Sequence, residues 1–337
     1  MLDTMTLAQR VGQLFMVDCP TTYAAQATLD DISQYGVGTI ILDGTSQLSV
    51  TATAAVTAQL QRRAAAGVRL FISTDQEGGE VQRLRGPGFS TIPSAVEQGT
   101  EPVSTLRSAA QLWGSQLRQA GVGVDLGPVL DTVPANSAGN PPIGDLDREY
   151  GRTPSVVTAH GLAVAQGLAA AGVDATAKHF PGLGRVSGNT DLSAGVRDTV
   201  TTSTDPYLAP FIAAINQHIA FMMMSTAIYT RIDPTQPAAF SPAIVSGLLR
   251  QRLGFQGVIV SDDLGGAAQV SGYSVGARAV AFLAAGGDMV LTVVASQIAE
   301  MTAAVIARAG VDSGFRAQVD AAALVVLTAK QNEGLLG

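Results

Sequence analysis

A lysine and a histidine stand side by side in the segment AKHFPGLGRVSGNTD, residues 177–191, directly behind a short apolar run. The chain contains only two lysines and three histidines, so the pairing of Lys178 with His179 is notable. Neither a surface loop nor a strand core needs both residues, since burial of a cation without a partner costs free energy. Two adjacent donors at a strand end therefore make this segment a candidate binding site.

Polar residues recur where the short apolar runs of this chain end. They are Asp18, Asp43, Asp75, Asp131, Lys178 with His179, Ser225, and Asp262 with Asp263. A single aspartate at such a position can simply cap a turn or the next helix. Turn chemistry does not explain Lys178, however, and in a closed parallel barrel all these positions face one mouth, where catalytic groups sit. We therefore expect a functional site at the ends of these runs.

Eight short apolar runs alternate with longer segments, and the runs span residues 12–18, 37–43, 69–75, 122–131, 174–180, 220–226, 257–263 and 288–294. Most of them are continuous and rich in β-branched residues, which is typical of strands buried on both faces. The segments between them, such as 104–121 and 154–172, carry apolar residues at three- and four-residue spacing and end on a glycine. This pattern indicates amphipathic helices.

Eight strand–helix units in succession predict an α/β protein with a (β/α)8 TIM barrel. Few shifts of composition mark a boundary, so we expect a single (β/α)8-barrel domain over residues 1–337. An open, doubly wound sheet is the alternative, because local patterns do not distinguish a closed sheet from an open one. The irregular stretch 127–154 is too long for a simple connection, and we expect it to be a functional loop.

The composition argues against several kinds of partner. A net charge of −7, an isoelectric point near 4.9 and the lack of any Lys/Arg cluster disfavour a nucleic-acid partner. Cys19 is the single cysteine, so an intrachain disulfide and a cysteine-built metal site are both impossible. The three histidines are dispersed, and we expect no metal and no cofactor. Charged residues such as Asp288 interrupt the apolar runs, so we expect no membrane span.

Three motifs resemble the glycoside hydrolase family 3 β-N-acetylglucosaminidases: STDQEGGEVQRLRG (73–86), KHFPGLG (178–184) and GVIVSDDLGGAA (257–268). The opening MTLAQRVGQLFMVD and the segment LLRQRLGFQGVIVSDD (248–263) are similar to the barrel of the same family. The resemblance covers nearly the whole chain, in order and at consistent spacing. Other members of the wider family carry a second α/β domain after the barrel. This chain ends too soon for one, so it looks like the single-domain branch.

The resemblance implies roles for particular residues. It places Asp262 as the nucleophile of a retaining glycosidase, and because a nucleophile must stay ionised, we expect nearby cations and donors to keep its pKa low. Asp263 is expected to orient its loop by hydrogen bonding. The terminal sugar would be held by Asp75, Arg83, Arg148, Lys178 and His179. On residue type alone, surface salt bridges for the two arginines and a packed ring for His179 are the alternatives.

One loop departs from the family pattern. Single-domain members usually follow KHFPGHG with a loop containing Asp-Ser-His, whose histidine is the general acid/base. Here Asn189, Thr190 and Asp191 stand at these positions, and the loop has no histidine. We expect Asp191 to take the acid/base role directly, as carboxylic acids do in most glycosidases. A solvated or turn-forming aspartate is the alternative.

By resemblance, the chain is expected to be a retaining exo-β-N-acetylglucosaminidase that forms a covalent glycosyl-Asp262 intermediate and acts on peptidoglycan fragments. Three alternatives stay open: a β-glucosidase, a phosphorylase that passes the sugar to phosphate, and a catalytically impaired sugar-binding protein. We expect a small carbohydrate as partner and a monomeric state. The opening residues do not have the pattern of a signal peptide, but a trimmed leader leaves no trace, so a cytoplasmic and an exported location both stay open.

Overall fold

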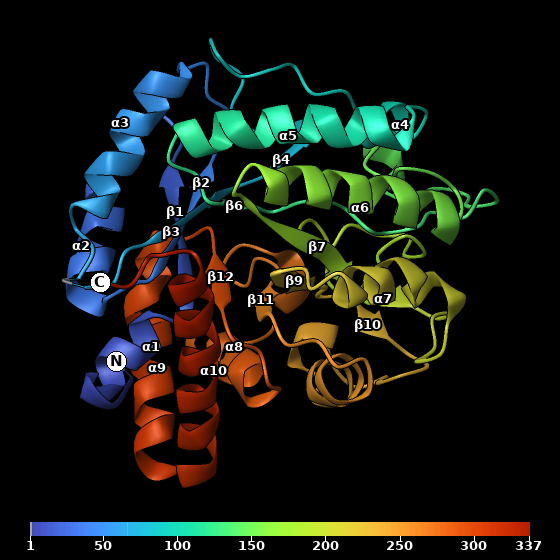
Figure 1. The fold of residues 1–337 in the computed structure, drawn as a ribbon. Coiled ribbons are helices and arrows are strands. Elements are labelled where there is room, and N and C mark those ends of the chain that lie inside the picture. Colours follow the sequence, from blue (N-terminus) through green and yellow to red (C-terminus); the bar gives the residue numbers. More distant parts are fainter. Residues whose placement is uncertain (1, 66) are drawn as a thin grey trace.

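Parallel strands form the centre of the molecule, whose computed structural model describes residues 2–65 and 67–337 (Figure 1). In chain order they are β1 (Phe15–Pro20), β2 (Thr39–Asp43), β3 (Phe71–Thr74), β6 (Val124–Asp125), β7 (Asp174–Phe180), β9 (Phe221–Met224), β11 (Val258–Ser261) and β12 (Val290–Thr292). Each of the first six pairs in parallel with the next, and β12 pairs with β1.

The sheet closes between its first and last strands in the spatial order. A β-bridge joins Val260 to Met289, and the amide of Ser261 donates to the carbonyl of Met289 at 2.9 Å. This contact brings β11 beside β12, so every one of the eight strands has a neighbour on both sides. The predicted (β/α)8 barrel is therefore confirmed, and the open, doubly wound alternative is wrong.

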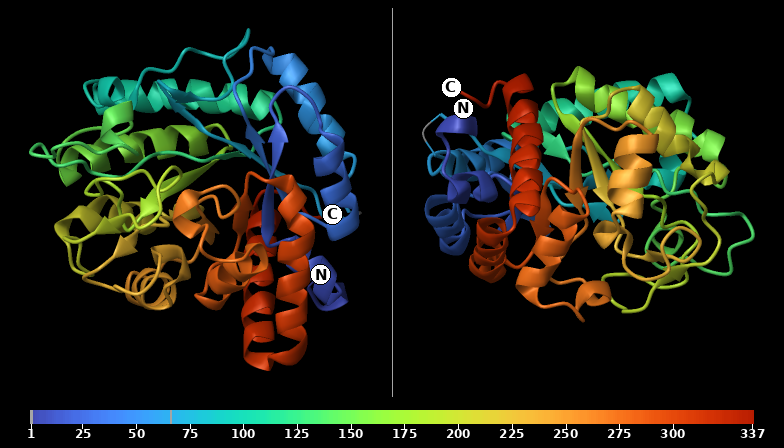
Figure 2. Two further views of the ribbon diagram at one scale, coloured as in Figure 1. Left: turned by 180° about the vertical axis from the view of Figure 1, so that it is seen from behind. Right: turned by 90° about the horizontal axis from the view of Figure 1, so that it is seen from below.

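Helices lie outside the strands in both views of Figure 2. They are α1 (Leu7–Gly12), α2 (Gln26–Tyr35), α3 (Val50–Gln61), α4 (Ala95–Gln98), α5 (Val103–Gln119), α6 (Pro154–Ala170), α7 (Ala209–Asn216), α8 (Val275–Ala284), α9 (Ile298–Val311), α10 (Ser313–Asn332) and a π-helix, Ala243–Arg252. Short 3₁₀ turns cover Leu2–Thr4, Gly144–Leu146, Pro206–Leu208, Ala238–Phe240, Ala268–Val270 and Ala295–Gln297. None of the described helices is long and apolar enough to cross a membrane.

Burial on both faces explains the continuous apolar runs. Every residue of β3, β9 and β11 is buried. The rings of Phe71 and Phe221 meet edge to face with their centroids 5.5 Å apart. Because β3 and β9 are not neighbours in the sheet, this contact crosses the barrel interior, which is a packed core rather than a pore.

Two predicted strands have different bounds in the structure. The first strand begins at Phe15 rather than at residue 12, because α1 extends to Gly12. Gly12 lies so close to the carbonyl of Tyr35 that a β-carbon at this position would collide with it. The run 122–131 is regular only over β6, since Pro128 has no amide hydrogen to continue the ladder. The predicted helices 104–121 and 154–172 match α5 and α6, and glycines with positive φ follow both.

The amino-terminal end of the barrel is closed by Lys330 from α10, whose side chain is fully buried. Its ammonium group donates to Oε1 of Gln13 at 2.7 Å and to the carbonyls of Gly38 and Arg69 at 2.8 and 2.9 Å. These three acceptors precede β1, β2 and β3. Lys330 therefore ties the starts of three strands to the last helix, and the opposite end of the barrel is left for the site.

Candidate active site

A cavity of about 450 Å³ opens at the carboxyl-terminal ends of the strands. Its lining includes side chains at the ends of β2 and β7 and side chains that directly follow β3 and β11. All the predicted site residues line it: Asp75, Arg83, Arg148, Lys178, His179, Asp191 and Asp262. Residues that are up to 187 positions apart in the chain, such as Asp75 and Asp262, thus meet at one mouth.

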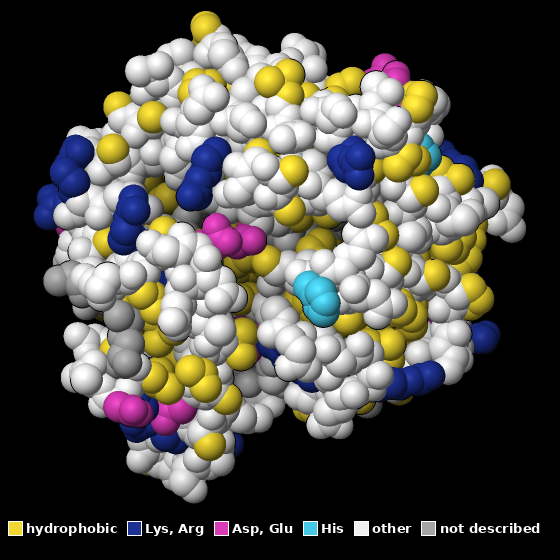
Figure 3. Space-filling model, in the orientation of Figure 1, with side chains coloured by type: hydrophobic (Ala, Val, Ile, Leu, Met, Phe, Trp, Pro, Cys, Tyr) yellow, Lys and Arg dark blue, Asp and Glu magenta, His cyan; other side chains and the backbone are white. Residues whose placement is uncertain are grey.

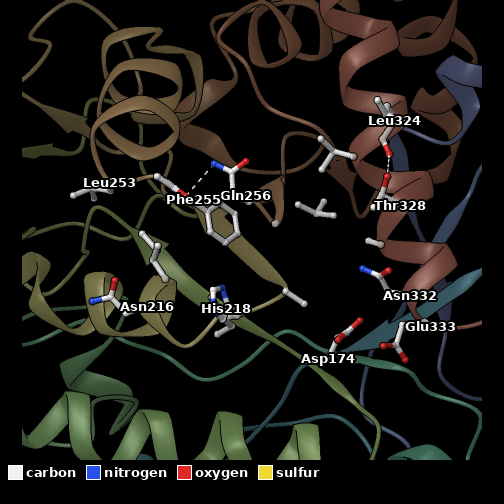
Figure 4. A pocket seen from close by; sticks show the side chains of 18 residues that line it. Asp174, Asn216, His218, Leu253, Phe255, Gln256, Leu324, Thr328, Asn332 and Glu333 are labelled. Carbon is white, nitrogen blue, oxygen red and sulfur yellow. Dashed lines mark hydrogen bonds between the residues drawn. The ribbon is translucent and has the colours of Figure 1, made fainter.

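A larger cavity of about 780 Å³ lies at the other end of the barrel, between the starts of β7, β9 and β11 and one face of α10 (Figure 4). The carboxylates of Asp174 and Glu333 lie near one another there, and burial together with the charge of Glu333 raises the pKa of Asp174 to about 7. None of the predicted site residues lines this cavity. We place the site in the smaller one, because barrel enzymes carry their chemistry at the carboxyl-terminal face.

Glu77 forms ion pairs with two buried cations of the site, Arg148 and Lys178. It lies on β4 (Gln76–Gly78), which forms a short hairpin with β5 (Val81–Gln82) directly after β3. Arg148 donates to both of its carboxylate oxygens at 2.7 and 2.8 Å, and Nζ of Lys178 lies 2.6 Å from Oε1. Although burial acts to raise it, these two cations hold the pKa of Glu77 well below its usual range.

Asp75 is the second partner of Lys178, whose Nζ donates to Oδ1 at 2.6 Å. Lys178 is only 2% exposed, and Asp75 and Glu77 together raise its pKa although burial opposes this. Nearby Asp125 is also buried, and burial raises its pKa to about 7. Below that pH Asp125 is neutral, and the cations Lys178 and Arg148 face the carboxylates Asp75 and Glu77. A set of charges that is balanced in this way suits a neutral ligand with hydroxyl groups better than an ion.

His179 is oriented by a fully buried carboxylate. Nδ1 of His179 lies 2.7 Å from Oδ2 of Asp131, and Oδ1 of Asp131 accepts from the amides of His179 at 3.2 Å and Leu183 at 2.6 Å. An ionised carboxylate only accepts, so this contact assigns the proton of a neutral imidazole to Nδ1. Among the described residues Nε2 has no hydrogen-bond partner. The packed-ring interpretation of His179 is incomplete, because the residue also lines the cavity.

Asp262 follows β11 directly, and its amide donates to the carbonyl of Met224 at 3.0 Å. Burial raises its pKa to about 6; His179 lowers it, while the charges of Asp191 and Asp263 raise it further. The expectation of a low pKa is therefore wrong, because desolvation outweighs the lowering effect of His179. The carboxylate of Asp263 accepts from the amides of Gly265, Gly266 and Val293 at 2.7–3.0 Å, so it does orient the following loop.

Asp191 is exposed at the rim of the cavity, in a turn that its own carboxylate does not build. Oδ1 of Asn189 accepts from the amide of Asp191 at 2.8 Å, and the carbonyl of Asn189 accepts from the amides of Leu192 and Ser193. Asn189 is thus the turn-forming residue. Within the described part of the chain no hydrogen bond engages the carboxylate of Asp191, which leaves it available to the cavity.

Arg83 lies further out, with Nε 3.5 Å from Oδ1 of Asp43 and about a third of both side chains exposed. In the described structure its Nε has no hydrogen-bond partner. The surface salt bridge considered for Arg83 is therefore present but long, and the one considered for Arg148 is instead a buried pair with Glu77.

On the face shown in Figure 3, the described Lys and Arg side chains are scattered and form no continuous basic patch.

The sequence profile of the glycosyl hydrolase family 3 N-terminal domain matches residues 6–329. The chain belongs to glycosyl hydrolase family 3. This family 3 chain is 38% identical over 255 residues to a beta-hexosaminidase of Xanthomonas campestris pv. campestris strain B100, and the match covers 73% of the chain and 74% of that protein. It is thus a glycoside hydrolase.

Solved structures of family 3 proteins have the same fold. The β-N-acetylhexosaminidase of Beutenbergia cavernae DSM 12333 superposes with a TM-score of 0.96 at 49% identity, over 97% of this chain and 99% of that one. A family 3 β-N-acetylglucosaminidase from Paenibacillus sp. str. FPU-7 gives a TM-score of 0.91 at 32% identity, over 98% of this chain and 63% of that one. The resemblance of the three motifs to family 3 is therefore confirmed.

Glu77 and Asp131 contact lining residues of the cavity, Glu77 through Arg148 and Lys178 and Asp131 through His179, although neither is among the predicted site residues. A signal for Glu77 exists in the sequence, because it stands in the motif DQEGG two residues after Asp75, and a strand-end lysine needs a carboxylate partner. Asp131 is one of the aspartates at strand ends, but nothing local links it to His179. No group of three or more potential metal ligands occurs in the described residues.

Proposed function

We propose that this protein is a retaining, exo-acting β-N-acetylglucosaminidase that works through a covalent glycosyl-Asp262 intermediate. The observation that carries the proposal is the position of Asp262, a half-buried carboxylate at a strand end, in the same cavity as a fixed set of donors and the unengaged carboxylate of Asp191. The names of the Xanthomonas and Beutenbergia relatives support an N-acetylhexosaminide as substrate.

The first step joins the sugar to the enzyme. The carboxylate of Asp262 attacks the anomeric carbon as the bond to the leaving oxygen breaks, and Asp191 gives its proton to that oxygen. In the second step Asp191, now a carboxylate, takes a proton from water, whose oxygen displaces Asp262 from the anomeric carbon. Both groups return to their starting protonation states, and the anomeric configuration is retained.

Neutral hydroxyl and amide groups of the terminal sugar fit the remaining side chains. Asp75 has one carboxylate oxygen that Lys178 does not occupy, and this oxygen can accept from sugar hydroxyls. Lys178, Arg148 and His179 can donate to hydroxyl and acetamido oxygens, with Glu77 and Asp131 holding them in place. Fixed donors of this kind need little reorganisation when the sugar binds.

Water is a better acceptor than phosphate in this cavity. Asp43, Asp191, Asp262 and Asp263 all line it, while the charges of Lys178 and Arg148 are already balanced by carboxylates. A phosphate group brings additional negative charge to a site that repels it. This charge distribution supports the hydrolase over the phosphorylase, and the unengaged Asp191 supports a working enzyme over a sugar-binding protein.

Hydrolysis of 4-nitrophenyl N-acetyl-β-glucosaminide, compared with 4-nitrophenyl β-glucoside, tests the proposal. We expect kcat/KM to be at least about 100-fold higher for the N-acetyl substrate, because a site that binds the acetamido group rejects a sugar without it. Added phosphate is expected neither to raise the rate nor to yield a sugar 1-phosphate. Sugar binding without turnover would instead support the binding-protein alternative. Peptidoglycan fragments are the natural substrates that we propose, with the enzyme acting as a monomer.

A further inference from the structure

Gln269 holds the loop that carries Asp191. It lies in the 3₁₀ turn Ala268–Val270, and its side chain is only 6% exposed. Oε1 of Gln269 accepts from the amide of Val196 at 2.8 Å, and Nε2 donates to the carbonyl of the same residue at 3.2 Å. We infer that Gln269 is a positioning residue, which sets Asp191 at the distance from Asp262 that acid/base catalysis requires. The inference rests on the proposed acid/base role of Asp191.

The backbone of the same turn holds the other end of the Asp191 segment. The backbone amide of Gln269 donates to the carbonyl of Thr190 at 3.0 Å, and the amide of Ala268 donates to the carbonyl of Asp191 at 3.1 Å. Residues 190–196 are therefore fastened at both ends to one short turn. That turn follows Asp262 in the chain, so the two carboxylates are linked through a single continuous segment, residues 262–270.

The opposite part of the loop has a different anchor. Nδ2 of Asn140 donates to the carbonyls of Leu183 and Val186 at 2.8 and 2.9 Å, so Asn140 fixes the stretch before Asp191 but not Asp191 itself. Beyond that stretch, residues 191–195 are exposed. Gln269 supplies the buried side-chain contact that fastens Val196, where this exposed stretch ends.

Placement matters for this carboxylate because retaining glycosidases hold their two carboxyl groups about 5–5.5 Å apart. A displacement of about 1 Å can cost on the order of 100-fold in rate. If Gln269 is lost, Val196 loses both of its side-chain contacts, and the turn at Asn189–Ser193 can move as a unit on the backbone bonds that remain. Asp262 keeps its own strand and loop contacts, so the nucleophile should not move.

Gln269→Met removes both contacts to Val196 and keeps the length of the side chain. For phenyl N-acetyl-β-glucosaminide, whose leaving group needs a proton, we expect kcat/KM to fall about 10- to 100-fold. For the 2,4-dinitrophenyl substrate, whose leaving group needs none, we expect a change of less than about threefold, since the nucleophile is intact. Gln61→Met is the matched control, because Gln61 makes the same paired contact with the backbone of Leu70 at 2.8 and 3.0 Å, away from the cavity.

Asp191→Asn separates this inference from the proposed function. The expected dependence on the leaving group is a large loss of kcat/KM with the phenyl substrate and a small loss with the 2,4-dinitrophenyl substrate. If Asp191→Asn shows this dependence and Gln269→Met does not, Asp191 is the acid but Gln269 has no positioning role. If Asp191→Asn also lacks the dependence, the acid/base assignment itself is wrong. An equal loss with both substrates in Gln269→Met would mean a purely structural role. Should that variant not fold, Gln269→Glu keeps the acceptor for Val196 and is expected to show the same dependence with a smaller loss.

Discussion

The ammonium group of Lys178 lies 2.6 Å from a carboxylate oxygen of Glu77, and both side chains are almost completely buried. Glu77 also binds Arg148 through both oxygens, so one carboxylate orients two cations that come from separate parts of the chain. Buried charges of this kind are costly unless each one is paired. The geometry of the proposed sugar-binding donors therefore depends on a residue that need not touch the sugar.

Glu77→Gln should weaken substrate binding more than chemistry. A neutral amide cannot accept from both Arg148 and Lys178 in the same way, so the two donors lose their fixed positions. We expect kcat/KM to fall on the order of 10- to 100-fold, mainly through a higher KM. Steady-state kinetics with an aryl N-acetylglucosaminide measure this effect. Glu80→Gln, an exposed position in the same hairpin, is the control and should behave as the wild type.

Asp131→Asn should reduce turnover by changing the proton of His179. The amide of an asparagine presents hydrogens where Asp131 now accepts three donors, so the ring loses its Nδ1-protonated tautomer and its orientation. A loss of kcat/KM on the order of 100-fold or more is expected from the effect of a wrong tautomer. Asp198→Asn is the matched control, since Asp198 is equally buried and accepts from Val200 and Thr201 outside the cavity. Equal activity losses in both variants would contradict the role of Asp131.

The acidic limb of the pH profile should report Asp262. Its pKa is raised to about 6, chiefly by burial, and the nucleophile must be ionised, so kcat/KM should rise with pH through about 6. The charge of Asp191 contributes to the raised pKa, and His179 opposes it. With the 2,4-dinitrophenyl substrate, Asp191→Asn should therefore move the limb to lower pH and His179→Gln should move it to higher pH. Shifts in the opposite directions would be inconsistent with these electrostatics.

Asp262→Asn should stabilise the protein while it abolishes activity. Because the pKa of Asp262 is higher in the folded state than in the unfolded chain, the folded state binds more protons between about pH 4 and 6, and stability falls as pH rises through that window. Above pH 6 the cost is complete, at about 3 kcal/mol for a shift of this size. The variant should thus exceed the wild type in free energy of unfolding at pH 7, and the difference should shrink towards pH 4. Chemical denaturation at both pH values measures it, with Glu80→Gln as a surface control.

Order and type of the barrel elements were predictable because they depend on local patterns. The runs that became β9 and β11 are continuous and almost entirely apolar, and parallel strands that follow one another in the chain pair with one another. The strand expected over 122–131 is shorter, because Pro128 interrupts its hydrogen bonding. Strand ends such as Asp75, Lys178 and Asp262 could be placed at one mouth from the barrel topology alone.

Long-range contacts within the site were not predictable in the same way. Glu77 acquires its role from Arg148 and Lys178, which are 71 and 101 residues away in the chain. The pKa of Asp262 depends on how deeply the closed barrel buries it, and the sequence motif around it carries no measure of burial. Gln269 and Val196 are 73 residues apart, and both lie outside the three family motifs. The roles of the site residues stay predictions until they are measured.

Covalent trapping of Asp262 tests the central claim most directly. A 5-fluoro N-acetylglucosaminyl fluoride carries a leaving group that needs no proton, so the result does not depend on Asp191. After incubation, intact-protein mass spectrometry should show the addition of one sugar, and peptide mapping should place it on Asp262, with no addition to Asp262→Asn. A label on another residue, or turnover of the fluoride by the wild type with no Asp262 adduct at any time, would contradict the proposed mechanism.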